Sequence, residues 1–63
     1  MELSHLKVGH TVKVYVKTKK GVFSYTGELL NVNEGFMELK DYKDLKIRAF
    51  NMMDVNMIEE LDI

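Results

Sequence analysis

Residues 22–39 read VFSYTGELLNVNEGFMEL, and this stretch decides the fold. Its apolar and β-branched residues predict two strands, over residues 22–32 and 36–40. The residues between them, NVNEG at 31–35, supply the asparagine and glycine chemistry of a tight turn. The stretch is therefore predicted to form a hairpin, and the remaining residues supply the strands that close it into a small barrel.

A change of parity inside the first of these strands predicts a bend. Tyr25 and Leu29 share one parity, whereas Leu30 and Val32 have the other, and Gly27 lies close to this change. A glycine within a strand marks a bend or bulge, so we expect the strand to turn sharply at Gly27 and contribute to both halves of a barrel.

The segment before the hairpin has the clearest strand pattern in the chain. Over residues 11–18, Val12, Val14 and Val16 alternate with polar and aromatic residues, which is typical of a half-buried strand. The loop that follows ends at Gly21, which is free to take a positive φ. In the later strand over residues 36–40, the same alternation places Met37 and Leu39 inward and exposes Phe36 and Glu38.

The two ends of the chain are less regular. Residues 1–8 carry Leu3 and Leu6 with Ser4 as a cap, which predicts one or two turns of N-terminal helix. Residues 51–63 fit either a short helix capped by Asp54 or a fifth strand over residues 55–58. We favour the strand, because four strands leave the sheet unclosed.

A fourth strand is predicted over residues 45–50, after a polar connection. We expect Leu45, Ile47 and Ala49 to face inward and Arg48 to point outward. The fold prediction is thus a mainly β protein, a single domain over residues 1–63 formed as a small, strongly bent, five-stranded antiparallel barrel of the SH3-like or Sm-like kind.

The chain of 63 residues has no cysteine, so neither a disulfide framework nor a thiolate metal site stabilises it. Small domains without such links often bury further surface against a partner subunit, which predicts an oligomer. No apolar run approaches the roughly 20 residues of a membrane span, and the first residues do not resemble a secretion signal. We therefore expect a soluble, cytoplasmic protein with no membrane partner.

Charge is unevenly distributed along the sequence. Residues 1–25 carry five lysines and one glutamate, whereas residues 26–63 carry four basic and nine acidic residues, and the net charge is −1. An ordinary mixed-sign surface explains this pattern. The alternative is one basic and one acidic edge, which would favour head-to-tail association.

The sequence offers no catalytic or metal-binding motif. It has no Ser/His/Asp or Cys/His arrangement and no phosphate-binding glycine loop. His5 and His10 are five residues apart, a spacing that matches no helical pair of ligands. We expect neither an enzyme nor a cofactor nor a metal site.

Gly27-Glu28-Leu29, then Asn33 and Phe36-Met37-Glu38-Leu39, resembles the first motif of the Sm and Sm-like (LSm) proteins. The preceding valine strand with Gly21 and the short N-terminal helix are also similar to that family. The resemblance implies a strongly bent five-stranded barrel that assembles into a homo-oligomeric ring of about five to seven subunits, the fourth strand of one subunit pairing with the fifth of the next. It also implies binding of single-stranded, uridine-rich RNA near the pore.

The resemblance assigns the RNA-binding residues Asn33, Phe36, Glu38, Arg48 and Asn51. Phe36 takes the position that stacks on a base, Asn33 stands where aspartate is usual, and Glu38 replaces the base-reading asparagine with an acceptor that repels phosphate. Two alignments of the second motif compete. Residues 47–51, IRAFN, resemble its Arg-Gly pair with alanine for glycine, whereas residues 54–58, DVNMI, resemble the strand that follows that pair.

Two functions remain open from the sequence. The first is an RNA-binding Sm-like ring that uses Phe36 and Asn33, with Arg48 or Asn51. The second is a protein-interaction or scaffold module that binds no RNA, which Glu38 and the acidic C-terminal half favour.

Overall fold

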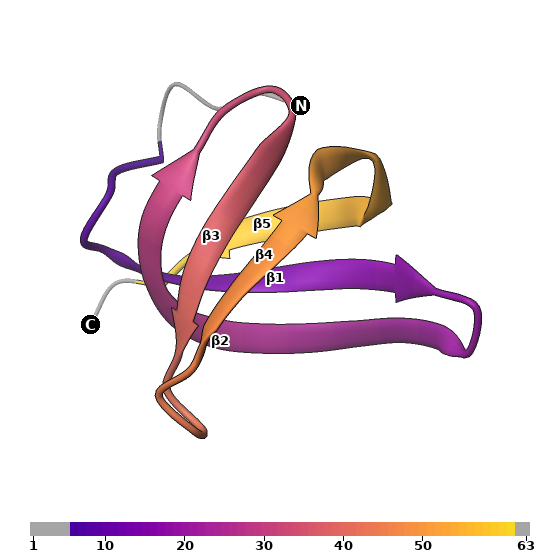
Figure 1. Cartoon of the computed structure of the whole chain (residues 1–63), viewed down its shortest axis with the longest axis horizontal. Helices are drawn as coiled ribbons and strands as arrows, with labels where there is room; N and C mark the ends of the chain where they lie inside the picture. Colours follow the sequence, from indigo (N-terminus) through magenta and orange to yellow (C-terminus); the bar gives the residue numbers. More distant parts are fainter. Residues whose placement is uncertain (1–5, 62–63) are drawn as a thin grey trace.

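The computed structural model describes residues 6–61 and contains one five-stranded antiparallel sheet (Figure 1). Its strand order is β4-β3-β2-β1-β5, so β4 and β5 are the two edges. The mainly β, five-stranded antiparallel prediction is confirmed, but the sheet is open, because β4 and β5 are not paired with each other within the described residues. The elements are β1 (Thr11–Thr18), β2 (Gly21–Val32), β3 (Phe36–Asp41), β4 (Ile47–Asn51), the 3₁₀ turn η1 (Met52–Asp54) and β5 (Val55–Glu60).

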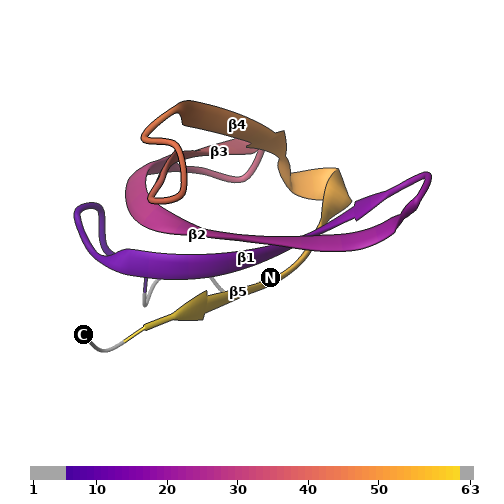
Figure 2. The same ribbon diagram turned by 90° about the horizontal axis from the view of Figure 1, so that it is seen from below.

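The long strand β2 connects two layers of the molecule. Figure 2 shows β3 and β4 lying over β1 and β5, with the curved β2 passing from one layer to the other. The first part of β2 pairs with β1 and its second part pairs with β3. The two strands predicted within residues 22–39 are therefore present as β2 and β3, and β2 has the expected bend.

A β-bulge at Leu30 explains the change of parity in β2. Leu29 pairs with Leu39, but the next paired residue, Asn31, faces Glu38, so Leu30 is the extra residue in the ladder. An extra residue of this kind reverses the inward and outward alternation and increases the local twist. Val32 consequently returns to the side of the sheet that carries Leu29 and packs against the core.

The bulge lies three residues beyond Gly27, and the structure gives this glycine a further role besides the predicted bend. A Cβ atom on Gly27 would lie 2.7 Å from the carbonyl carbon of Lys40 and 3.1 Å from the Cα of Asp41. The first distance is shorter than real Cβ contacts allow, and the second is tighter than nine in ten of them. Glycine is needed here so that the backbone of β3 can approach β2 closely.

The core lies between the two layers and is small. The predicted inward alternation of β1 and β3 is confirmed, because their valines, Met37 and Leu39 are all buried. The buried apolar residues among those described are Val12, Val14, Val16, Leu29, Met37, Leu39 and Val55.

The β1–β2 turn also agrees with the sequence prediction. Gly21 has φ of 126°, as expected for a glycine that closes a hairpin. The Thr18 hydroxyl accepts a hydrogen bond from the Lys20 amide at 3.1 Å and donates one to the Gly21 carbonyl at 2.9 Å. The side chain of Thr18 therefore fixes the turn from within.

Of the predictions for the two ends of the chain, the C-terminal one is confirmed and the N-terminal one is not. The strand favoured for the C-terminal segment is confirmed as β5, and the residues before it form only the three-residue turn η1. The N-terminal helix is not supported: Leu6 and Lys7 are not helical, and a turn follows at Val8 before β1. Residues 1–5 of that prediction lie outside the described residues.

The inward face predicted for β4 is wrong. Ile47 is 66% exposed, and Ala49 and Leu45 are exposed as well, whereas Arg48 and Phe50 are half-buried. The reason is that the ring of Phe50 packs on Tyr25, with 5.0 Å between their centroids, and Arg48 binds a buried carboxylate. Leu45 lies before the strand, in the left-handed region with φ of 61°.

The basic and acidic segments of the sequence are neighbours in the sheet, because Lys13 on β1 pairs with Glu59 on β5. The alternative of one basic and one acidic edge stays a prediction. Between Leu6 and Leu61, the structure contains no helix with the length and hydrophobicity needed to cross a membrane.

We expect Gly27→Ala to destabilise the fold by about 1–3 kcal/mol, because the added methyl group meets backbone atoms of β3 that cannot move aside cheaply. Urea unfolding followed by circular dichroism measures this change. Gly35→Ala is the matched control, since a Cβ there meets only the Asn33 side chain, at 3.4 Å. Equal stability of the two variants would show that the approach of β3 to Gly27 is not a constraint.

Candidate functional site

Phe36, Glu38 and Asn51 lie on the outer face of the β3–β4 pair. Phe36 pairs with Asn51 across the two strands, and Glu38 pairs with Ala49, so these side chains share one side of the sheet. Phe36 is 41% exposed, which confirms the exposure predicted from its parity with Glu38. The aromatic ring offered for stacking in the predicted site is therefore accessible on the surface.

Asn33 supports the loop that presents Phe36. Its Oδ1 accepts hydrogen bonds from the amides of Gly35 at 2.8 Å and Phe36 at 3.0 Å. This use of an asparagine side chain is the local turn chemistry expected from the sequence. The oxygen is thus committed to the loop, and only the amide NH₂ of Asn33 is left for a ligand.

Asn51 has a similar structural task. Its Oδ1 accepts a hydrogen bond from the Met53 amide at 2.9 Å and caps the 3₁₀ turn η1. Because Asn51 is the cross-strand partner of Phe36, its remaining NH₂ group lies on the same face as that ring. Phe36, Asn51 and Glu38 are therefore brought together as predicted, with Asn33 in the adjoining loop.

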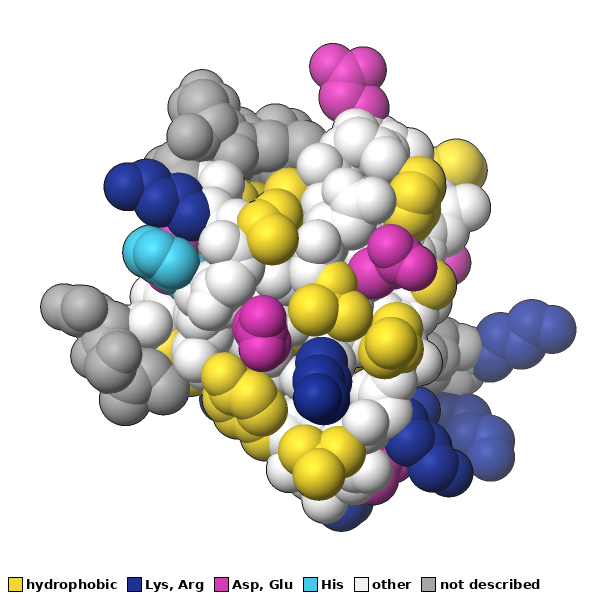
Figure 3. Space-filling model, turned by 60° about the vertical axis from the view of Figure 1, so that its left-hand side comes forward, with side chains coloured by type: hydrophobic (Ala, Val, Ile, Leu, Met, Phe, Trp, Pro, Cys, Tyr) yellow, Lys and Arg dark blue, Asp and Glu magenta, His cyan; other side chains and the backbone are white. Residues whose placement is uncertain are grey.

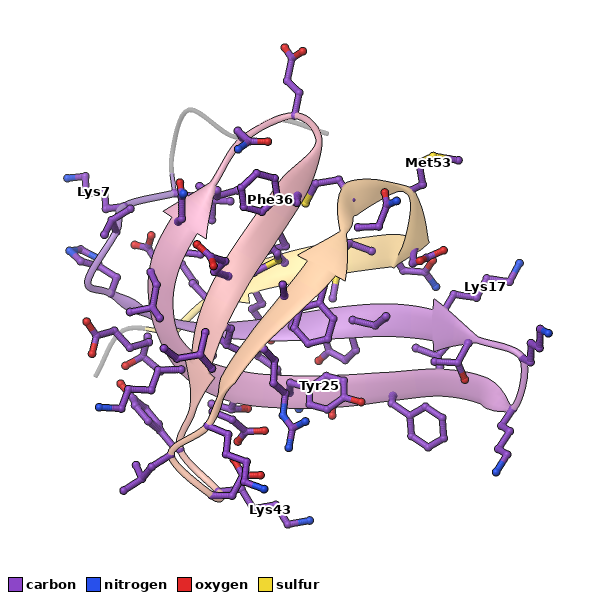
Figure 4. The ribbon with its side chains drawn as sticks, in the orientation of Figure 1. Lys7, Lys17, Tyr25, Phe36, Lys43 and Met53 are labelled. Carbon is purple, nitrogen blue, oxygen red and sulfur yellow. The ribbon has the colours of Figure 1, made fainter. Side chains whose placement is uncertain are left out.

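Arg48 does not join this group. It pairs with Leu39, a buried residue, so it lies on the inner face, opposite to Phe36. Its Nε donates to Asp41 Oδ2 at 2.9 Å and its Nη2 to Asp44 Oδ2 at 2.7 Å. Its guanidinium also lies 5.5 Å from the centre of the Tyr25 ring, and Figure 4 shows Tyr25 and Phe36 well separated. The outward orientation predicted for Arg48 is therefore wrong.

Arg48, Asp41, Asp44 and Tyr25 form a cluster on the inner face, and Asp41 is its central residue. Its side chain is almost fully buried, with a relative exposure of 6%, and its Oδ1 accepts a hydrogen bond from the Lys43 amide at 2.8 Å. Its carbonyl accepts a further bond from the Leu45 amide at 2.7 Å. The hydrogen bond from the Lys43 amide and the bond from Arg48 lower the pKa of Asp41 below its ordinary value.

Sequence reasoning missed Asp41 because it lies in the polar segment DYKD and resembles turn residues in general. The available signal was an aspartate directly at the end of a strand, followed seven residues later by an arginine inside another strand. Two strands joined by a short turn place such positions side by side. The Arg48–Asp41 ion pair could have been inferred from that spacing.

An open pocket of about 420 Å³ lies beside this ion pair. The exposed aromatic residues Phe23 and Tyr42 are among those that line it, together with Lys43. The residues that line the pocket are Phe23, Ser24, Tyr25, Thr26, Asp41, Tyr42, Lys43 and Arg48. Of these, only Arg48 belongs to the predicted site.

The outer face itself is not a continuous apolar surface. Its exposed Phe36 lies beside the charged Glu38, and Figure 3 shows one side of the molecule on which hydrophobic side chains lie among basic and acidic ones. Across residues 6–61 no group of three or more histidine and carboxylate side chains is arranged to hold a metal ion. His10 instead forms a contact of 3.3 Å with Glu60, and His5 lies outside the described residues.

Comparison of the chain with family models, with curated proteins and with solved structures found no match. Functional interpretation therefore depends on the geometry of the chain itself.

We expect the stability of the fold to decrease as the pH falls below about 4, because Asp41 then binds a proton more readily in the unfolded chain than in the folded chain. The pKa of Asp41 is lower in the folded chain than in the unfolded chain, so its contribution is complete above the ordinary pKa. That contribution is lost as the pH falls through the folded value. Urea midpoints measured between pH 7 and pH 2.5 test this dependence.

In Asp41→Asn, the midpoint at pH 7 should be lower and its decrease on acidification smaller than in the unmodified chain. Asp54→Asn is the control, because the Asp54 side chain is exposed and lies in a different turn. The same acid response in both variants would contradict a special role for Asp41.

Proposed function

We propose that this chain is a subunit of a homo-oligomeric ring, formed when β4 of one copy pairs with β5 of the next, and that the ring is a scaffold of Sm-like type. The strand order carries this proposal, because it places β4 and β5 at the two edges of an open sheet. Free edges present unpaired backbone groups and favour pairing with another chain. Antiparallel addition of β5 to β4 would continue the sheet from copy to copy.

Exposed apolar residues on both edge strands support the same proposal. Ile47 on β4 and Met57 on β5 are both among the exposed large hydrophobic residues. The core within one subunit is small, so further burial between subunits would stabilise the fold. A head-to-tail contact between two different edges gives a closed ring when the rotation per subunit divides a full turn.

Light scattering at micromolar concentration should give a mass of several subunits. Ile47→Glu should shift this mass toward that of the monomer, because a charge on an edge strand opposes strand pairing. Val8→Glu is the matched control, since Val8 is also exposed but lies outside the sheet. A monomeric mass for the unmodified chain would refute the ring.

A second candidate function is the binding of single-stranded RNA at the Phe36 face. The exposed ring of Phe36 and the free NH₂ group of the neighbouring Asn51 favour it, because single-stranded RNA is commonly bound by stacking and by hydrogen bonds to base edges. Glu38 on the same face repels phosphate, and Arg48 is neutralised by two aspartates on the opposite face. The scaffold is therefore the better supported of the two candidates.

If RNA binds at this face, Phe36→Ala should weaken binding of oligo-uridine by about 1–3 kcal/mol, the usual effect of removing one stacking ring. Fluorescence anisotropy at low salt measures the affinity. Met53→Ala removes another exposed apolar side chain and serves as the control. Unchanged affinity in Phe36→Ala would exclude this face as the site.

A further inference from the structure

The first half of β2 has one unpaired edge. β1 runs along one side of β2 from Gly21 onward, whereas β3 pairs with the other side only from Gly27 onward. Figure 1 shows no strand beside β2 on that second side between the hairpin turn and the β3–β4 turn. Residues 21–24 are all exposed. This edge is separate from β4 and β5, the two edges at the ends of the strand order.

The direction of the backbone groups along this edge follows from one hydrogen bond. The Thr26 carbonyl accepts a bond from the Tyr42 amide at 3.1 Å, so Thr26 directs its backbone groups away from β1. Successive residues of a strand direct these groups to alternate sides. Ser24 and Val22 therefore point their N–H and C=O groups away from β1 as well, and neither has a backbone partner on that side within residues 6–61. Such an edge is a template for a further strand.

A groove follows the same edge. The pocket of about 420 Å³ is lined by the consecutive residues Phe23, Ser24, Tyr25 and Thr26, among others. Successive side chains of a strand point to opposite faces of the sheet. A pocket that touches all four residues therefore runs along the edge of β2, where another main chain can lie beside the unpaired groups.

Two aromatic side chains lie on the inner side of this edge. Phe23 pairs with Val16 and Tyr25 pairs with Val14, so both rings share the face of the buried valines. Phe23 is nevertheless 46% exposed, at a position where β3 does not yet pair with β2. Two apolar side chains at alternate positions of an added strand would cover these two rings.

A lysine stands near each end of the edge. Lys43 lines the pocket, and Figure 4 shows it in the β3–β4 turn, on the side of β2 away from β1. Lys20 directly precedes the first residue of β2 at the other end. Neither lysine takes part in a salt bridge within residues 6–61, and the acidic residue of the pocket, Asp41, is bound to Arg48. The charge left along the edge is positive and complements acidic residues in a partner.

We propose that the free edge of β2 over residues 22–25 binds a short extended peptide of another protein, in which two apolar residues, one residue apart, are flanked by acidic ones. The peptide adds as a strand antiparallel to β2, and its main chain bonds to Ser24. Its apolar side chains cover Phe23 and Tyr25. Unpaired N–H and C=O groups in a row select a peptide main chain, because no other biological polymer presents the matching groups at the spacing of a strand.

The direction of the added strand places its two acidic ends. A strand antiparallel to β2 runs in the direction of β3, so its first residues lie near Lys43 and its last residues near Lys20. The site uses neither the edges assigned to the ring nor the Phe36 face. The proposal therefore stands independently of both proposed functions.

The probe is a labelled peptide of about seven residues, EEFTVEE with both ends capped, and fluorescence anisotropy measures its affinity. Its phenylalanine lies opposite Tyr25, its threonine opposite Ser24 and its valine opposite Phe23. A methyl group on the threonine amide nitrogen should weaken binding about tenfold or more, because it removes the donor to the Ser24 carbonyl. The same methyl group on the valine nitrogen is the matched control, since that amide points away from β2, and it should change the affinity by at most about twofold.

Two variants of the protein test the edge and the groove. Ser24→Pro should weaken binding about tenfold or more, because it removes the edge N–H, and proline is tolerated where the N–H does not face a neighbouring strand. Ser24→Thr keeps this donor and is its control. Phe23→Ala should weaken binding about tenfold, whereas Phe36→Ala, which removes an exposed ring from the other face, should leave the affinity unchanged. Circular dichroism verifies that each variant is folded.

Hydrogen exchange gives a readout that does not depend on affinity. The bound peptide should slow exchange of the Ser24 amide, which faces the groove, and leave the exchange of the Tyr25 amide, which faces β1, unchanged. No binding by the unmodified chain, or equal effects of the two methyl groups, would overturn the proposal. Loss of binding in Ile47→Glu but not in Ser24→Pro would place the peptide on the β4 edge and would also overturn it.

Light scattering separates this site from the ring. Ser24→Pro should have the same mass as the unmodified chain, because the ring is assigned to β4 and β5. A lower mass would mean that copies of the chain occupy the β2 edge, which would overturn the peptide site. Oligo-uridine that displaces the peptide and loses affinity in Ser24→Pro would assign the edge to nucleic acid and would overturn the proposal too.

Discussion

The close approach of β3 to Gly27, followed by the bulge at Leu30, is the constraint on which the rest of the structure depends. A side chain at Gly27 would meet the Lys40 carbonyl group, so only glycine permits this spacing of the two backbones. The bulge then reverses the alternation of β2, which keeps both Leu29 and Val32 directed at the core. One strand can thus belong to two layers, and residues 6–61 enclose apolar side chains with no α-helix among them.

The same constraint fixes the position of Asp41. Gly27 pairs with Asp41, so the last residue of β3 lies at the point where the two backbones are closest. Asp41 then holds the following turn through its hydrogen bonds to the Lys43 and Leu45 amides, and it receives Arg48 from β4. Because Arg48 is drawn inward to a buried carboxylate, Ile47 and Ala49 must face outward. The apolar surface of this edge strand is therefore a consequence of the ion pair.

Most of the fold could be predicted from the sequence because most strands report their burial through alternation. The alternating valines of β1 and the pair Met37 and Leu39 of β3 correctly predicted which side chains are buried. The parity change in β2 correctly predicted an irregular position in that strand, which is the bulge at Leu30. Its position was attributed to Gly27, since a glycine indicates equally a bend and a close approach of backbones. In β4 the alternation predicts the wrong face, because the exposed positions carry the apolar Ile47 and Ala49 and the half-buried positions include the charged Arg48.

The candidate site could be predicted only where its residues act locally. Phe36 and Glu38 share a strand, so their common face follows from period two, and the turn role of Asn33 follows from its neighbours. The inner position of Arg48 depends on a carboxylate from another strand, which periodicity does not detect.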